Sequence, residues 1–409
     1  GATSIYKSID RGSTWQLLDS AALPFQSTYQ LAILNNQIFC SSYGSSVWKR
    51  NGIFNSYAGH VYRDNNYNGI IDANDSTLRN MILYTTPSSW LASTNNTGAF
   101  QLTTDVQGDS LKLAVQPYIT VTPSGYLLDT ITFNNLDFLV NVDTTISDLA
   151  IDLESTARIA LFRDDIFTMT IRNNGGRKQS GIVTLIVDSA FNYISADRIP
   201  FQINGDTLKW QLDTLDFNET TIINVTTHPS FSAMFGDSVR FLSEVTPVYA
   251  DMFPTDNVSN LNDIIVGAFD PNDKSCQVGD VIEIDSLDGK DFLYTIRFQN
   301  VGNIPANDVL VIDTLNAHLD PTTFRILNSS FPVNLEMQST GVVKFHFIGI
   351  NLPDSNTNEV QSHGFIKYAI RSKTTTSVGD AITNKADIFF DINPAITQIV
   401  TPIFKHCPN

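Results

Sequence analysis

Short runs in which apolar and polar residues alternate recur along the whole chain, and this alternation constrains the fold more than any other feature. The run Phe-Leu-Tyr-Thr-Ile-Arg-Phe at residues 292–298 is an example. Alternation with a period of two is typical of a β-strand that buries one face. Helical periodicity is almost absent, and Asn, Thr, Ser and Phe are common whereas Lys and Glu are scarce. The sequence therefore predicts an all-β fold.

Length and charge set the outer limits of that fold. A chain of 409 residues is long enough for roughly three or four domains that each bury a core. The formal net charge is −17, from 42 acidic and 25 basic residues spread without a run, which argues against a nucleic-acid partner. No stretch approaches the ~18 consecutive apolar residues of a membrane-spanning helix, and no basic-then-apolar leader opens the chain. The sequence therefore predicts no membrane span.

One segment places oxygen-bearing side chains at the intervals that a hard cation requires. Counting Asp64 as position 1 of a twelve-residue loop, side-chain oxygens fall at positions 1, 3, 5, 9 and 12, Gly69 stands at position 6 for the sharp turn, and the Ile70 carbonyl stands at position 7. The predicted ligands are Asp64, Asn66, Asn68, Ile70, Asp72 and Asp75. We therefore predict that this loop binds a structural Ca²⁺ ion.

An Asn/Asp-rich hairpin turn is the alternative interpretation, because Asn68-Gly69 is itself a strong turn signal. Two of the predicted ligands are neutral amides, and position 12 is Asp75 instead of the longer Glu. Both features predict weak binding, in roughly the 10⁻⁴ to 10⁻³ M range of extracellular modules. A site this weak fills only where calcium is abundant, so the loop predicts a location outside the cell.

Residues 1–56 carry a different motif. The pattern Ser8-x-Asp10-x-Gly12-x-x-Trp15 resembles the Asp-box found in the β-propeller blades of sialidases and sortilin-like proteins. The resemblance implies a terminal propeller-like blade in which Asp10 and Gly12 shape a hairpin turn and Trp15 packs between sheets. The motif is architectural in those families, so it implies no enzymatic activity. A short independent β-hairpin unit is the alternative.

Residues 57–148 contain the calcium loop within a longer pattern. The segment Gly59-His-Val-Tyr-Arg-Asp-Asn-Asn-Tyr-Asn-Gly-Ile-Ile-Asp72 resembles the calcium-binding B repeats of staphylococcal serine-aspartate-repeat adhesins and related prealbumin-like modules. The resemblance implies a β-sandwich that calcium stiffens. Asp75-Ser76 stands where those repeats carry another acidic residue, which leaves the last ligand open.

Residues 149–267 and 268–409 resemble each other as a diverged tandem repeat. The corresponding segments, in order, are 165–176 with 291–302, 208–216 with 343–351, and 236–239 with 379–382. Three correspondences in the same order favour two copies of an immunoglobulin-like (Ig-like) β-sandwich of about seven strands. The first copy resembles cell-surface repeat domains of bacterial adhesins.

The last copy carries the most specific resemblance. Its motifs Asp270-Pro-Asn-Asp-Lys274, Phe298-Gln-Asn-Val-Gly302 and Ile388-Phe-Phe-Asp-Ile-Asn393 resemble a module of secreted Bacteroidota proteins that precedes the C-terminal sorting domain of type IX secretion cargo. The resemblance implies export by the type IX secretion machinery to the extracellular space or the outer-membrane surface. It also implies that a sorting domain follows this segment in the parent protein.

The three cysteines are too few for a disulfide scaffold and lack metal-ligand spacing. Cys276 at the entry and Cys407 at the exit of the last copy are candidates for one disulfide, which would close a loop of ~130 residues. Two unpaired thiols are the alternative. Cys40 is interpreted as a buried strand residue of the blade.

The sequence offers no recognisable catalytic constellation. The six histidines are scattered without metal-ligand spacing, and neither a G-x-S-x-G elbow nor a Walker loop is present. We therefore predict no catalytic residue, no cofactor-binding residue and no enzymatic activity, although a carboxylate pair from distant segments could still form a glycosidase site.

Together these features predict a secreted structural protein of adhesin type, built as a stalk of β-sandwiches in a row. Its expected partners are the type IX machinery during export, surface glycans or proteins, and other copies of the same chain. Two alternatives are the accessory C-terminal region of a secreted propeller hydrolase and a subunit of a self-assembling extracellular filament or ring.

Overall fold

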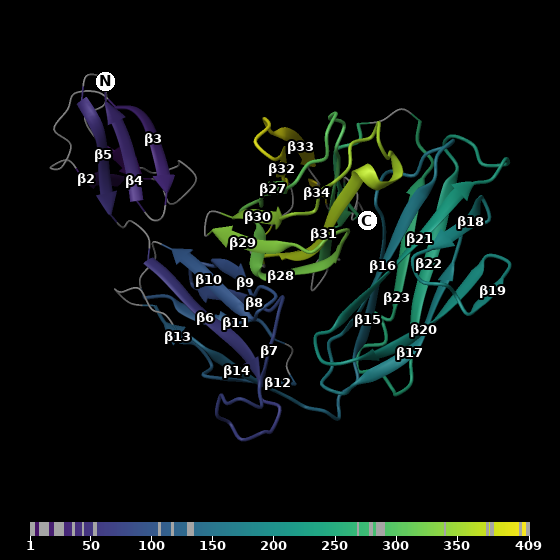
Figure 1. Ribbon diagram of the computed structural model, residues 1–409, viewed down its shortest axis with the longest axis horizontal. Helices are drawn as coiled ribbons and strands as arrows, with labels where there is room; N and C mark the ends of the chain where they lie inside the picture. The colour runs from purple at the N-terminus through teal and green to yellow at the C-terminus, as the bar shows by residue number, and fades with distance from the viewer. Residues whose placement is uncertain are drawn as a thin grey trace.

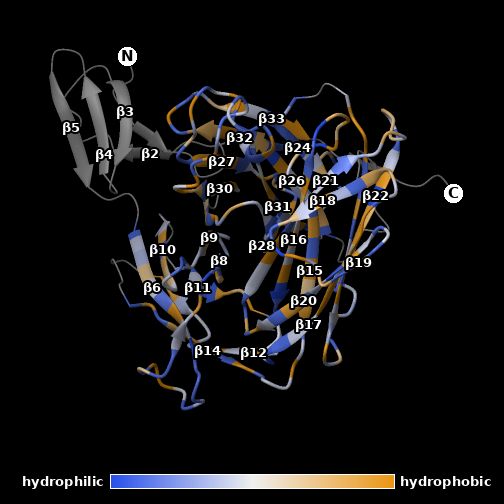
Figure 2. Cartoon of the chain, turned by 45° about the vertical axis from the view of Figure 1, so that its right-hand side comes forward, coloured by the Kyte–Doolittle hydropathy of each residue, from blue (hydrophilic) through white to orange (hydrophobic). Residues whose placement is uncertain are grey.

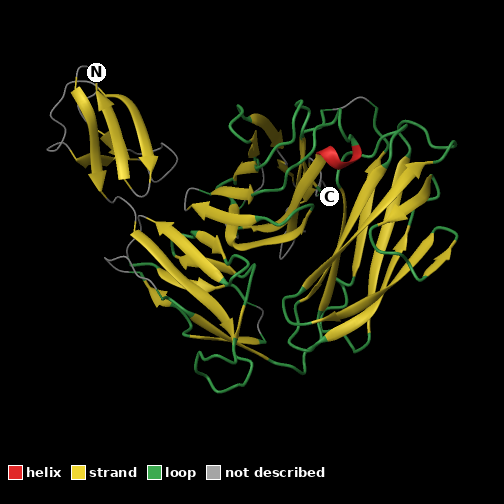
Figure 3. Ribbon diagram, viewed as in Figure 1, coloured by secondary structure: helices red, strands yellow, loops and turns green. Residues whose placement is uncertain are grey.

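The structure is a computed structural model that describes residues 55–400, apart from 105–107, 116–117, 129–134, 268–269, 278–280, 284–290, 339–340, 374–375 and 377–379. Of the first 54 residues, and of residues 281–283 and 403–405, it describes the backbone of strands alone. The described elements are β-strands and one 3₁₀ helix, Val360–Ser362 (Figure 3). The predicted all-β fold is confirmed. Within the described residues, no helix is long and apolar enough to span a membrane.

The strands described within the first 51 residues form two small antiparallel sheets. β1 (Ile5–Lys7) pairs with β2 (Gln16–Asp19), and β3 (Thr28–Leu34), β4 (Gln37–Ser42) and β5 (Ser45–Asn51) form a three-stranded meander. The described strands do not show a propeller. The Asp-box residues Ser8, Asp10, Gly12 and Trp15 lie outside the described residues, so the predicted role of the motif stays a prediction.

The first module, residues 55–142, is a sandwich around Tyr57, Val61, Phe100 and Phe138, all of which are buried. Burial alternates along its longest strand, as the sequence pattern predicts. One sheet has the order β10 (Ala99–Thr104), β6 (Asn55–Arg63), β14 (Phe138–Val142), β12 (Ile119–Thr122), with β7 (Ser76–Thr77) also on β6. The facing strands are β13 (Tyr126–Leu127), β11 (Ser110–Leu113), β8 (Ile82–Thr86) and β9 (Leu91–Ser93).

The middle module, residues 149–267, packs two sheets around Phe167, Trp210 and Phe241. The rings of Phe167 and Phe241 stack with centroids 4.0 Å apart. The first sheet has the order β15 (Leu149–Ser155), β16 (Asp165–Asn173), β21 (Thr220–Pro229), β18 (Phe191–Ala196). The second has the order β19 (Gln202–Asn204), β20 (Thr207–Leu215), β17 (Gln179–Ile186), β22 (Ser238–Pro247), β23 (Val258–Ile264).

The last module, residues 270–400, encloses Phe298, Phe345 and Tyr368. Its first sheet has the order β24 (Asp273–Cys276), β26 (Asp291–Gln299), β31 (His363–Ser372), β28 (Leu319–Ser329). Its second has the order β29 (Asn334–Gln338), β30 (Val342–Phe347), β27 (Val309–Thr314), β32 (Asn384–Phe390), β33 (Ile396–Val400). β25 (Val281–Glu283) pairs with β34 (Ile403–Lys405). Apolar residues alternate with polar ones along many of these strands (Figure 2).

The middle and last modules share one topology. When the strands of each module are counted from its own first strand, and β25 is left out, the two modules have the same strand orders. The first sheet has the order 1, 2, 7, 4, and the second sheet has the order 5, 6, 3, 8, 9. The turn after the second strand is also the same. Asn173 Nδ2 donates to the carbonyls of Arg177 (2.8 Å) and Leu215 (3.0 Å). In the same way, Asn300 Nδ2 donates to the carbonyls of Ile304 (2.9 Å) and Leu352 (3.0 Å). Asn300 therefore corresponds to Asn173, one residue away from the register that the sequence correspondence gave.

The three modules do not stand in a row, because the last one contacts both of the others (Figure 1). β9 of the first module pairs with β29 of the last, which joins their sheets into one sheet of nine strands. Leu91 of β9 packs in the core of the last module. The expected end-to-end stalk of independent sandwiches is thus wrong for these modules. The sequence could not predict this arrangement, because the two paired strands are far apart in the chain. The hydrogen bond from Ser93 Oγ to the Leu335 carbonyl, for example, joins residues 242 positions apart.

Candidate metal centres

The predicted calcium loop connects β6 to β7 and is wound around its own side-chain oxygens. Asp64 is buried at the end of β6, and it accepts the backbone N–H groups of Asn68 on Oδ1 (3.2 Å) and of Gly69 on Oδ2 (2.9 Å). Gly69 has a φ of 74°, which glycine adopts without a steric penalty. The sharp turn predicted at position 6 is therefore present.

The other side chains of the loop converge on Asp72. Its Oδ2 accepts the Nδ2 groups of Asn66 (3.0 Å) and Asn68 (2.8 Å), and its backbone N–H donates to Asp75 Oδ2 (2.9 Å). A backbone hydrogen bond from Asn74, followed by those from the two amides, lowers the pKa of Asp72. Its carboxylate is ionised at neutral pH, as a calcium ligand must be. The two amides would bind an ion by turning their oxygens toward it.

Hydrogen bonds therefore link Asn66, Asn68 and Asp75 to Asp72, whereas Asp64 accepts backbone N–H groups of the turn. Asp64, Asp72 and Asp75 are not among the described acidic groups whose carboxylate oxygens all lie within 4.8 Å of one another. Ile70 donates its backbone N–H to Asn68 Oδ1 (2.8 Å) and leaves its side chain exposed. Calcium binding by these residues, and the part of the Ile70 carbonyl in it, stays a prediction.

Contacts at both ends of the loop tie it to the rest of the fold. The backbone N–H of Asp64 donates to the Val140 carbonyl on β14 (2.9 Å). The preceding residue, Arg63, forms an ion pair with Asp216 of the middle module, with Nη1 and Oδ1 2.5 Å apart. The loop is thus one residue away from a contact between modules.

That contact is made by the turn between β20 and β21. Phe217 of the middle module is buried in the core of the first module, and Asn218 Nδ2 donates to the Arg79 carbonyl (2.7 Å). Lys178 adds a second cation to Asp216 at 3.0 Å. Burial would raise the pKa of Asp216, but hydrogen bonds from Arg63 and Lys178 outweigh it and lower that pKa.

The structure also brings together a second acidic group, which the sequence did not predict. Asp148, Asp251 and Asp256 each offer a carboxylate oxygen, and these oxygens lie within 4.8 Å of one another. The three residues, called the junction triad below, could hold a metal ion. Burial, and then the charges of Asp148 and Asp251, raise the pKa of Asp256 to about 7. No sequence motif predicts the triad, because Asp148 is about a hundred residues from Asp251 and Asp256 and meets them only through the fold.

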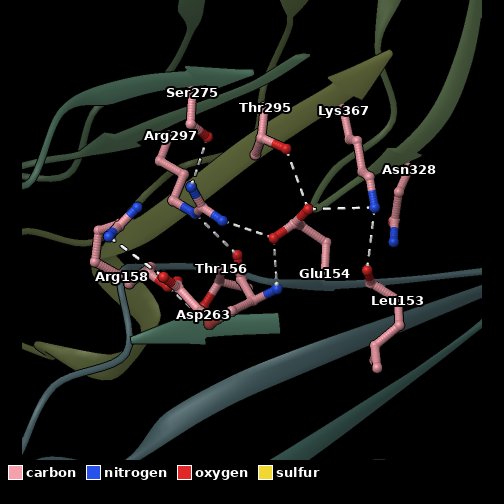
Figure 4. A network of polar contacts seen from close by, with 12 residues as sticks. Leu153, Glu154, Thr156, Arg158, Asp263, Ser275, Thr295, Arg297, Asn328 and Lys367 are labelled. Carbon is pink, nitrogen blue, oxygen red and sulfur yellow. Dashed lines mark hydrogen bonds and ion pairs between the residues drawn. The ribbon is translucent and has the colours of Figure 1, made fainter. Parts of the chain in front are cut away.

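The middle and last modules meet through buried charges (Figure 4). Glu154 on β15 contacts Arg297 of β26 (Oε1 to Nη2, 2.6 Å) and Lys367 of β31 (Oε2 to Nζ, 3.3 Å). Lys367 also contacts Asp152 Oδ1 at 2.9 Å, and Thr295 donates its hydroxyl to Glu154 Oε2 at 3.1 Å. These charged side chains are nearly inaccessible to solvent, so each depends on its partners for compensation.

The protonation of this buried network follows from the pairing. Burial would raise the pKa of Glu154, but the charges of Lys367 and Arg297 outweigh it and lower that pKa. Burial would lower the pKa of Lys367, but Asp152 and Glu154 raise it. Glu154, Arg297 and Lys367 therefore hold their charges at neutral pH, whereas burial raises the pKa of Asp152 despite its contact with Lys367. The network joins the two modules.

A cavity of about 710 Å³ lies where the three modules meet. Ile82 of the first module, Arg172 and Asp256 of the middle module, and Leu293 and Arg325 of the last module are among the residues that line it. The junction triad is therefore in contact with the cavity through Asp256.

The predicted disulfide cannot be followed to both of its residues. Cys276 is half-buried at the end of β24 and packs against the core of the last module. Cys407 lies outside the described residues. The pairing of these two cysteines stays a prediction.

One family model matches the last part of this chain. Residues 270–402 match a family described as "Domain of unknown function (DUF7619)", which spans the last module. No curated protein sequence matches the chain.

Several solved β-sandwich proteins resemble the chain in structure. One is the CARDB domain of a Pyrococcus furiosus protein in complex with di-metal ions, with 15% identity, a TM-score of 0.23, and coverage of 31% of this chain and 94% of that one. Another is the major pilin subunit of Bacillus cereus, with 7% identity, a TM-score of 0.25, and coverage of 87% and 99%. The collagen-binding domain of a Staphylococcus aureus adhesin has 10% identity, a TM-score of 0.24, and coverage of 34% and 99%. All three TM-scores are below 0.5, so no function is transferred from these proteins.

Proposed function

We propose that this chain is the passive structural part of an exported cell-surface protein of adhesin type, stiffened by calcium and delivered through type IX secretion. The observation that carries this proposal is the way the last module is fixed to both others. It shares a continuous sheet with the first module and a buried charge network with the middle one. Such joints suit a rigid spacer, because moving the modules apart would break the strand pairing of β9 with β29 and leave buried charges without partners.

The calcium loop supports the extracellular part of the proposal. Its ligand set, with two amides and Asp75 in the last position, fits a weak site that fills only in calcium-rich fluid. The resemblance of the last module to the domain before type IX sorting domains supports the export route. Carbohydrate or protein ligands on the host or neighbouring cell are the partners that an adhesin of this kind would take.

Labelling of intact cells tests the location. An antibody raised against residues 55–400 is expected to stain intact cells of the source organism, and protease added outside is expected to remove the signal. Staining that requires permeabilised cells would contradict the proposal. An antibody against a periplasmic protein is the control for cell integrity.

The accessory region of a secreted hydrolase is the second candidate, and the central cavity is the observation in its favour. Asp152, Asp256 and Asp291 line this cavity. Asp152 pairs with Lys367, and Asp291 pairs with Arg325 and Arg371, which suits a structural role for these two carboxylates better than acid–base catalysis. Glycan-array binding that is lost on Asp256→Asn would favour this second candidate.

A further inference from the structure

We propose that the junction triad of Asp148, Asp251 and Asp256 is a second calcium site, which clamps the linker between the first and middle modules. The proposal is independent of the function proposed above and of the loop at residues 64–75. Asp148 is the last residue of the linker, residues 143–148, between β14 and β15. Asp251 and Asp256 belong to the turn between β22 and β23. An ion bound to all three would therefore join the linker to the middle module.

The fold already holds these segments together by backbone contacts. Asp251 accepts the N–H of Leu149 on Oδ2 (2.8 Å) and that of Phe253 on Oδ1 (2.9 Å). The N–H of Met252 donates to the Ser147 carbonyl at 2.8 Å. The Asp251 carboxylate and the linker backbone are thus placed by structure that exists before any ion binds, which reduces the entropy cost of forming the site.

Two consecutive glycines, Gly175 and Gly176, pack closely against the backbone of the linker. The N–H of Gly175 donates to the Asp148 carbonyl (3.2 Å), and a Cβ on Gly175 would lie 2.7 Å from the Asp148 nitrogen. A Cβ on Gly176 would lie 2.3 Å from the Asp143 carbonyl oxygen. Only residues without a side chain allow this approach, so the position of Asp148 is tightly set.

Buried oxygens without hydrogen-bond donors point to a ligand at this place. Asp148 is 1% exposed, and its Oδ1 has no hydrogen-bond partner, whereas its Oδ2 accepts the Tyr118 hydroxyl at 2.5 Å. The Oδ1 atoms of Asp256 and Asn257 and the Oγ of Ser147 are also buried without partners. Four such atoms on two touching segments need an explanation, because buried polar atoms are rarely left unpaired. The Asn174 amide also acts on the Asp148 carboxylate, and a cation would supply the partner that the buried Oδ1 atoms of Asp148 and Asp256 lack.

The charges and donor types favour calcium in particular. Among the described residues, no Lys, Arg or His side chain forms an ion pair with a member of the triad. Arg325, the basic residue whose charge acts on Asp256, is already paired with Asp291. The donors are all oxygens, which suits a hard cation, and an irregular set completed by water suits Ca²⁺ better than the octahedral Mg²⁺. Asp256 borders the central cavity, which provides a route of entry.

Counting bound ions tests this proposal. The chain of residues 1–409, stripped with chelator, would be dialysed against 5 mM CaCl₂, on the order of the highest expected dissociation constant, and bound calcium measured by mass spectrometry of the metal. The triad variant is Asp256→Asn, which is isosteric and removes no hydrogen bond to its side chain that the structure shows. The loop variant is Asp72→Asn, and Asp206→Asn, at an exposed turn, is the matched control.

We expect Asp256→Asn to bind one calcium ion fewer than the wild type. We also expect the double variant Asp72→Asn, Asp256→Asn to bind one ion fewer than Asp72→Asn alone. Asp206→Asn is expected to bind as the wild type does. Without calcium, the melting temperature of Asp256→Asn should equal or exceed that of the wild type, because one of three repelling charges is removed. A calcium count unchanged by Asp256→Asn would overturn the site, whether or not the loop binds. The same titration with MgCl₂ would overturn the assignment to calcium if magnesium bound equally well.

Discussion

At the residue scale, Lys274, the last residue of the motif at residues 270–274, forms an enclosed ion pair. Lys274 Nζ lies 2.7 Å from Asp313 Oδ2, both side chains are inaccessible to solvent, and the Tyr368 hydroxyl donates to the same oxygen at 2.7 Å. The pair connects β24 in one sheet to β27 in the other. Burial lowers the pKa of Lys274 and raises that of Asp313, while each partner opposes the shift of the other.

Replacing one partner of this pair should be far more harmful than replacing both. We expect Lys274→Met to lower the free energy of unfolding by about 3–5 kcal/mol, because it leaves Asp313 buried without a cation. The double variant Lys274→Met, Asp313→Leu should recover much of the loss. Urea unfolding of the three variants measures the difference, and equal losses for single and double variants would contradict the argument.

A buried carboxyl in the middle module makes stability depend on pH. Burial raises the pKa of Asp165 to about 7, although the Arg163 guanidinium opposes the shift. The native state therefore retains a proton that the unfolded carboxyl, with a pKa near 3.9, releases. Stability from this group is present at low pH and is lost as pH rises from about 4 through about 7, by at most about 4 kcal/mol.

Asp165→Asn should remove this dependence. Relative to the variant, the wild type is expected to be more stable at pH 5 than at pH 8, as measured by urea unfolding at both values. A difference between the two proteins that stays constant across this range would count against a raised pKa. Asp206→Asn, at an exposed turn of the same module, is the matched control.

At the element scale, the calcium loop and the contact beside it should act together. Because Arg63, the last residue of β6, directly precedes the loop at Asp64 and pairs with Asp216, ordering the loop also orders this contact. With calcium at 100 times the dissociation constant, linkage predicts about 2.7 kcal/mol of added stability. Differential scanning calorimetry with calcium and with chelator measures it. The Asp72→Asn variant should lose the part of the shift that belongs to the loop, and an unchanged shift would refute the loop as a site.

The sequence predicts individual strands and loops, but it does not predict which strands pair between modules. Alternation marks long strands such as β26, and spacing marks the calcium loop, because both are local. β9, which joins two modules, has three residues and no room for a pattern. Glu154 and Lys367 carry residue types that are usually exposed, so nothing in their neighbourhood predicts a buried network. The junction triad likewise depends on contacts that form only after folding.

At the scale of the whole molecule, the buried network should make the middle and last modules unfold as one unit. Glu154→Gln leaves Arg297 and Lys367 without their shared anion, and we expect it to cost about 3–5 kcal/mol. Calorimetry should then show separate transitions where the wild type shows a joint one. Glu336→Gln, on a half-exposed pair with Lys344, is the control and should change stability by less than about 1 kcal/mol. A joint transition in both variants would contradict the assignment.

The pairing of β9 with β29 also decides how tension would travel through the protein. These strands are separated by the entire middle module in sequence, yet they adjoin in space. A force that pulls the first module away from the last would act directly on the hydrogen bonds between β9 and β29. It would reach them without first extending the polypeptide between the two strands. The contacts of the middle module with the first and last modules would carry the rest of the load, so the polypeptide between β9 and β29 would extend only after the strand pairing and these contacts had broken.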